Sequence, residues 1–115
     1  MNYSLLAILA ILTLSSCAIQ EANRVESIRQ KTLSDQSISN EIRSAILNKQ
    51  IMVGMTKQQV LASWGQPCGL CYGTRRSSAG DTWEYNPGET TSLGIGIGTY
   101  LYFDVNGILR YWSGP

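Results

Sequence analysis

The chain has 115 residues, with nine Lys and Arg against eight Asp and Glu, a formal net charge of +1, and no histidine. This length allows one small domain, and near-neutrality gives no electrostatic reason to expect a nucleic-acid partner. The absence of histidine removes the most common general base, the usual zinc ligand and the nucleophile pairs of Ser-His and Cys-His enzymes.

The chain begins with a short apolar segment that leads to a cysteine. Ser4 to Leu14 is almost wholly apolar, and Ser15-Ser16-Cys17 follows. This segment is typical of a secretory signal, because a helix that spans a bilayer needs about 20 residues. The Leu-Ser-Ser-Cys ending resembles the bacterial lipobox, which implies a signal peptide over residues 1–16 and a diacylated Cys17 that holds the protein at a membrane. The alternatives are an ordinary signal peptide cut near Ser16 and a short core helix.

Residues 17–38 are predicted to form the lipidated N-terminus and a flexible tether. This segment is polar with scattered apolar residues, and it contains one weak helical stretch around Ala22–Lys31. The folded domain is expected over residues 39–115. It begins with a helix that Ser39 can cap. The apolar positions of this helix follow the helical repeat at Ile42, Ala45 and Ile46.

A second short helix is the most clearly specified element of the chain. Gly54 belongs to the turn before it, and Thr56 and Gln59 have the spacing of a capping box, in which each side chain accepts a hydrogen bond from the other residue's amide. Gly65 is predicted to end the helix as a left-handed cap, and Pro67 prevents it from resuming.

The C-terminal half has the alternating pattern of β-strands. Thr82–Tyr85 is one predicted strand, Ile95 to Phe103 is a second, and Ile108 to Trp112 is a third. Asn106-Gly107 is predicted to form the last hairpin turn, with both residues at positive φ. The predicted fold is therefore α+β, with two short helices packed on one face of a three-stranded antiparallel β-meander.

Four motifs occur in order over roughly residues 50–112. They are Gly54-Met55-Thr56-Lys57-Gln58-Gln59-Val60, Gly65-Gln66-Pro67, Trp83-Glu84-Tyr85 and Phe103-Asp104-Val105-Asn106-Gly107. In this order they resemble the SmpA/OmlA (BamE-like) family of outer-membrane lipoproteins. The resemblance implies a helix-helix-meander domain, also seen in β-lactamase-inhibitor-like domains. It also implies a role in β-barrel assembly or envelope integrity.

Cys68 and Cys71 form a Cys-x-x-Cys pair directly after the predicted helix stop. A structural disulfide is favoured over an unpaired state and over a redox role, because thioredoxin-like pairs lie at a helix N-terminus and this pair follows a helix C-terminus. Zinc sites use four ligands, and the sequence offers two soft ones. A disulfide ring this small is expected to stabilise the fold modestly.

Six aromatic residues fall within the predicted meander: Trp83, Tyr85, Tyr100, Tyr102, Tyr111 and Trp112. A sheet that helices cover on one face leaves its other face open. These residues are therefore either core and cross-strand pairs or an exposed surface for a protein partner, since Tyr and Trp are good interface anchors. Arg75 and Arg76 are expected in a solvated loop, and the alternative is a contact with anionic lipid headgroups or with an acidic partner.

Taken together, these features predict a non-enzymatic module on the periplasmic side of the outer membrane, anchored through Cys17, that binds another envelope protein. No cofactor, metal or nucleic acid is expected. The alternative is an inhibitor-like or ligand-binding lipoprotein of the same fold that acts on a periplasmic enzyme.

Overall fold

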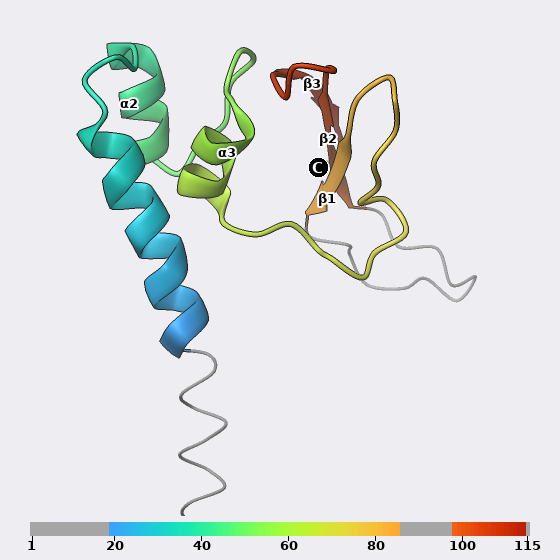
Figure 1. The fold of residues 1–115 in the computed structure, drawn as a ribbon, viewed down its shortest axis with the longest axis horizontal. Helices are drawn as coiled ribbons and strands as arrows, with labels where there is room; N and C mark the ends of the chain where they lie inside the picture. The colour runs from blue at the N-terminus through green and yellow to red at the C-terminus, as the bar shows by residue number, and fades with distance from the viewer. Residues whose placement is uncertain (1–18, 86–97, 115) are drawn as a thin grey trace, which may run out of the picture.

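The computed structural model describes residues 19–85 and 98–114, which form an α+β fold (Figure 1). The first helix covers residues 19–34, and the elements after it are α2 (Asn40–Leu47), α3 (Lys57–Trp64), β1 (Thr82–Tyr85), β2 (Thr99–Phe103) and β3 (Leu109–Ser113). The strands pair antiparallel in the order β1-β2-β3, which is the predicted meander. The predicted signal peptide, Cys17 and the part of the second strand before residue 98 lie outside the described residues.

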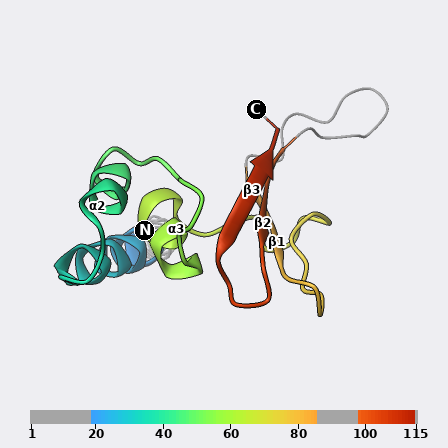
Figure 2. The same ribbon diagram turned by 90° about the horizontal axis from the view of Figure 1, so that it is seen from above.

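The helices lie to one side of the sheet, and buried side chains from both layers form one core (Figure 2). Ile46 of α2, Val60 of α3, Leu101 of β2 and Leu109 of β3 all have 0% exposure, as does Met55 in the connection before α3. Because every layer contributes to this cluster, neither the helices nor the sheet can bury its apolar face alone.

Both predicted helix caps are present. The Ser39 hydroxyl accepts a hydrogen bond from the Ile42 amide at 3.2 Å at the start of α2. At α3, the Gln59 amide donates to Thr56 Oγ1 at 3.2 Å and the Thr56 amide donates to Gln59 Oε1 at 2.9 Å. Gly65 ends α3 with φ 80° and ψ −161°, so its φ is positive as predicted while its ψ is extended instead of left-handed helical.

The connection before α3 joins the helical layer to the sheet. Gly54 lies in the predicted turn at φ 97°. Its amide donates to the Leu109 carbonyl at 2.8 Å, and the Leu109 amide donates to the Met55 carbonyl at 2.8 Å. These bonds cover the start of the free edge of β3. After α3, Pro67 lies in the non-helical segment that leads to the cysteine pair, as expected.

The first helix differs from the predicted flexible tether, because residues 19–34 are helical throughout and the second half packs on the domain. Its first turns are exposed and project beyond the other helices (Figure 1). Ile28 and Leu33 contact the core, and Thr32 is 5% exposed with its hydroxyl donating to the Ile28 carbonyl at 2.7 Å. Val25, Ile28 and Thr32 recur at helical spacing, so the buried stripe includes a threonine that the apolar pattern alone does not reveal.

Two arginines join the first helix to α2 by bonding the last carbonyls of the opposite helix. Arg29 donates to the carbonyls of Ile46 at 2.9 Å and Leu47 at 3.2 Å, at the end of α2. In return, Arg43 of α2 donates to the Asp35 carbonyl at 3.0 Å, just past the end of the first helix. Carbonyls at a helix C-terminus have no partner within their helix, so arginine donors from the opposite helix contribute bonds there. At the Ile46 carbonyl, the bond from Arg29 adds to one from the Lys49 amide at 3.1 Å.

The β2–β3 turn differs from the predicted Asn-Gly turn, because Gly107 has φ 76° and Asn106 does not have a positive φ. The Asp104 carboxylate accepts hydrogen bonds from the amides of Asn106 at 2.9 Å and Ile108 at 3.0 Å. The Gly107 amide donates to the Asp104 carbonyl at 2.9 Å. The prediction for Asn106 was wrong, since the Asp104 side chain fixes a longer connection that needs one positive φ instead of two.

Candidate partner-binding face and disulfide loop

Strand register decides which side chains share a face of the sheet. Directly opposed residues of antiparallel strands point to the same side. Leu101 is opposite both Trp83 and Trp112, so these two aromatic residues are on the core side. The opposite side, which we call the outer face, carries Thr82, Glu84, Tyr100, Tyr102, Tyr111 and Ser113.

Two of the six predicted aromatic residues belong to the packing between sheet and helices. Tyr85 is 6% exposed, its hydroxyl donates to the Gly65 carbonyl at 2.7 Å, and its ring meets the Trp64 ring edge-on at 5.2 Å. Burial raises the pKa of the Tyr85 hydroxyl well above its usual range. Trp83 is half-buried against Phe103, with ring centroids 4.7 Å apart. Tyr85 is therefore a core residue and is not accessible to a partner in this structure.

The open part of the outer face is a pair of stacked tyrosines. The rings of Tyr102 and Tyr111 lie 4.4 Å apart at an interplanar angle of 20°, and Tyr111 is 59% exposed. A shallow hollow beside them is also lined by Thr82, Arg110 and other residues of the 77–82 segment. We call Tyr102 and Tyr111 with this hollow the tyrosine surface. Trp112 is 41% exposed on the other side of the same strand.

One ion pair borders the tyrosine surface. Arg110 contacts the Asp104 carboxylate at 2.6 Å. The amide of Ile108, then Arg110 and the amide of Asn106, hold the pKa of Asp104 below its usual value, so this carboxylate stays ionised at neutral pH. The hollow therefore has a pair of opposite charges at its border, next to the rings of Tyr102 and Tyr111.

Residues 68–74, which we call the disulfide loop, run along the free edge of β1. Cys68 and Cys71 are disulfide-bonded with Cα atoms 5.4 Å apart, in agreement with the favoured interpretation. The Cys68 amide donates to the Glu84 carbonyl at 2.9 Å, and the Glu84 amide donates to Thr74 Oγ1 at 3.0 Å. The loop thereby occupies hydrogen-bonding groups of an edge strand that would otherwise be open to another chain.

The disulfide loop also covers part of the outer face, which the sequence analysis predicted to be open. A Cβ atom on Gly73 would lie 2.4 Å from a ring carbon of Tyr100 and 2.7 Å from Glu84 Oε1, so the loop backbone lies directly on these two side chains. Glu84 is 7% exposed. The Tyr100 hydroxyl donates to Glu84, and this hydrogen bond raises the pKa of Tyr100. Tyr100 is thus half-buried beside the loop and is not an open surface residue.

Two residues that the sequence analysis did not single out are the most exposed large apolar side chains of the described residues. Leu70 is 103% exposed and Tyr72 is 95% exposed, one within the disulfide ring and one just after it. The signal for Leu70 in the sequence was its position between two closely spaced cysteines, and Tyr72 directly follows the second of them. Arg75 and Arg76 follow with exposed side chains, as expected of a solvated loop.

Comparisons with protein-family models, curated proteins and solved structures give no match for this chain. Within residues 19–85 and 98–114, the structure has no helix with both the length and the apolar content needed to span a bilayer.

Proposed function

We propose that this chain is a lipoprotein of the outer membrane, anchored through Cys17, whose domain on the periplasmic side binds another envelope protein without catalysing a reaction. The lipobox-like ending of the apolar segment supports the anchor. The order of the SmpA/OmlA-like motifs supports a setting in β-barrel assembly or envelope integrity. It also supports a finer description of the fold, in which two short helices cover one face of a BamE-like meander.

The observation that carries the binding role is the tyrosine surface. Tyr111 presents 59% of its surface to solvent while it stacks on Tyr102 of the neighbouring strand. Rings held by strands and by each other lose little conformational entropy when a partner covers them, which favours binding. Tyrosine is also among the residues that most often anchor protein interfaces.

Site-specific crosslinking in living cells tests this role. A photo-crosslinking amino acid replaces Tyr111 in the full-length chain, and a matched variant carries it at Gln36, an exposed position in the turn after the first helix. We expect position 111 to give one discrete adduct with an envelope protein, identified by mass spectrometry, and position 36 to give none. Adducts that are equal at the two positions, or no adduct at position 111, would contradict the proposal.

The disulfide loop favours the second candidate, an inhibitor-like module that acts on a periplasmic enzyme. Leu70 and Tyr72 project from a loop that a disulfide holds in place, and such a pre-ordered loop enters a cleft at a lower entropic cost than a flexible one. A third crosslinking variant at Tyr72 separates the two functions. Trapping of a soluble hydrolase at position 72, without an adduct at position 111, would favour the inhibitor-like function.

A further inference from the structure

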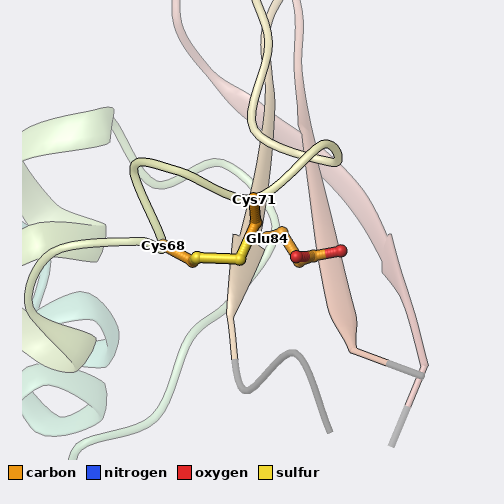
Figure 3. A group of neighbouring side chains, drawn as sticks. All are labelled: Cys68, Cys71 and Glu84. Atoms are coloured by element: carbon orange, nitrogen blue, oxygen red, sulfur yellow. A yellow bond between two sulfur atoms is a disulfide. The ribbon is translucent and has the colours of Figure 1, made fainter. Parts of the chain in front are cut away.

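The buried carboxylate of Glu84 lies next to the cysteine pair (Figure 3). One oxygen of Glu84 and the two sulfur atoms of Cys68 and Cys71 all lie within 4.8 Å of one another. Glu84 is 7% exposed, and its hydrogen-bond partner is the hydroxyl of Tyr100. The two cysteines are soft metal ligands, and Glu84 of β1 adds a carboxylate oxygen as a third possible ligand.

No cation of the described residues pairs with Glu84. The ion pairs of this part of the chain are Lys57–Asp81 and Arg110–Asp104. Burying a carboxylate is costly unless a cation or several hydrogen bonds compensate for the lost water. Reduction of the neighbouring disulfide would place two thiols beside this carboxylate. Loss of their protons would turn the two thiols into two further anionic groups. Such a cluster of three anionic groups is stabilised best by a bound cation.

The three ligand atoms suit a thiophilic divalent ion. Zinc binds cysteine sulfur at about 2.3 Å and carboxylate oxygen at about 2.0–2.2 Å, so the ligand atoms of one tetrahedral ion lie roughly 3.5–3.8 Å apart. The two sulfur atoms are bonded in this structure, so they must move apart after reduction to reach this spacing, while the Cα atoms of the two cysteines are 5.4 Å apart. An oxygen of Glu84 already lies within 4.8 Å of both sulfur atoms. Cys68 and Cys71 are partly exposed, which leaves room for water as a fourth ligand. Three protein ligands and one water are a common zinc coordination.

We propose that reduced Cys68 and Cys71, together with Glu84, bind one divalent ion of the zinc class, and that formation of the disulfide removes the site. A dithiol reduces the disulfide by giving two electrons and two protons, and it becomes a disulfide itself. A phosphine gives two electrons and takes the oxygen of a water molecule to become the phosphine oxide, and that water supplies the two protons. Both reductants yield two thiols. Binding of the ion then releases the two thiol protons to solvent. In an oxidising compartment the disulfide form predominates, so the metal form would mark reducing conditions. This site is independent of the proposed partner-binding function.

Cobalt titration of the full-length chain, extracted in mild detergent and reduced with a phosphine, tests the proposal. We expect one Co²⁺ per chain, with a thiolate-to-cobalt charge-transfer band in the near ultraviolet and tetrahedral bands in the visible, and displacement of both by Zn²⁺. The oxidised chain should show neither band. Absence of the bands from the reduced chain would overturn the proposal.

Substitutions separate this site from adventitious binding. Glu84→Gln should weaken Co²⁺ binding by at least about tenfold. Removal of a residue that only hydrogen-bonds to a metal ligand already costs about 10–100-fold in affinity, and we expect removal of a ligand itself to cost no less. Glu41→Gln, at an exposed carboxylate in the first turn of α2, should leave binding unchanged. Equal affinity of Glu84→Gln and wild type would contradict the role of Glu84.

X-ray absorption at the zinc edge provides a measurement on the unmodified chain, in case Glu84→Gln does not fold. We expect two sulfur ligands and two lighter ligands around the ion. A shell of four sulfur atoms would mean that two chains share the ion, and a shell without sulfur would mean that the cysteines do not bind it. Either result would overturn the proposal.

Discussion

The hydroxyl of Thr56 accepts a hydrogen bond from an amide that has no other partner at the start of α3. Thr56→Ala leaves the Gln59 amide without this acceptor, and we expect the free energy of unfolding to fall by about 1 kcal/mol. Chemical denaturation measures the change. Gln58→Ala, at the exposed neighbouring position of the same helix, is the control and should change stability little. An unchanged unfolding midpoint for Thr56→Ala would contradict the capping role.

The ion pair between Lys57 and Asp81 joins the start of α3 to the residue before β1, at 2.5 Å. The hydrogen bond from Lys57 is the main cause that lowers the pKa of the Asp81 carboxyl. Because the pKa of Asp81 is lower in the folded state than in the unfolded state, its carboxylate stabilises the fold at pH values above the unfolded pKa of about 3.9. This stabilisation is lost as the pH falls through the pKa of the folded state. The Lys57 side chain is 35% exposed, so solvent screening limits the contribution to less than about 1 kcal/mol.

Asp81→Asn should therefore lower the free energy of unfolding at pH 7. In acid, the variant and the wild type should have the same free energy of unfolding. Denaturation curves between about pH 2 and 7 measure the effect. We expect the two proteins to converge as the pH falls through the lowered folded pKa of Asp81. Glu21→Gln, at an exposed carboxylate without a partner among the described residues, is the control. A difference between Asp81→Asn and wild type that is constant across this range would mean that the ion pair is not its cause.

The contacts of residues with near neighbours in the sequence were predictable. The contacts between residues far apart in the sequence were not. The capping box of Thr56 and Gln59 depends on a spacing of three residues, and the structure confirms it. Glu84 lies close to Cys68 only because the disulfide loop runs along β1, which no local pattern reveals. Tyr85 was grouped with the other aromatic residues, and its place in the core depends on the position of α3 relative to β1.

At the scale of elements, the first helix and α2 stabilise each other through their C-terminal ends. Arg29→Ala removes hydrogen bonds to the Ile46 and Leu47 carbonyls, and we expect a loss of about 1–2 kcal/mol, since bonds from charged donors contribute more than neutral ones. Thermal unfolding followed by circular dichroism measures it. Arg24→Ala is the matched control, because Arg24 is exposed on the same helix without a partner among the described residues. Equal melting temperatures for the two variants would refute the contact.

The meander and the two short helices were predictable because caps, turns and alternation are local signals. The first helix was underestimated because its packed stripe combines Val25, Ile28 and Thr32, and a buried threonine weakens an apolar pattern. The turn at Gly107 was assigned the wrong conformation because the Asp104 side chain accepts hydrogen bonds that the Asn-Gly pair alone does not predict.

The disulfide loop holds the edge of β1, so loss of the disulfide should loosen that edge first. Reduction in metal-free buffer should cost about 2 kcal/mol, the amount that the chain-entropy model gives for so small a ring. Amide hydrogen exchange at Thr82, which donates to the Arg75 carbonyl at 2.9 Å, should accelerate by roughly tenfold or more. The Leu109 amide, bonded to Met55 on the far edge of the sheet, should stay protected. Equal acceleration at both amides would indicate global unfolding instead.

For the whole molecule, the two faces of one small sheet have different surroundings. The helices complete the core on one face. On the outer face, the disulfide loop covers Glu84 and Tyr100, and the stacked Tyr102 and Tyr111 remain open. This division leaves a limited aromatic area for a partner.

The proposed partner-binding role depends on attachment to the envelope. The mass of the N-terminal fragment, measured after digestion of protein isolated from the membrane fraction, tests whether Cys17 provides this attachment. We predict a fragment that begins at Cys17 and carries two or three acyl chains. A Cys17→Ser variant should lack acyl chains and leave the membrane fraction. A wild-type fragment that retains residues 1–16, or a Cys17 without lipid, would show that Cys17 does not anchor the protein.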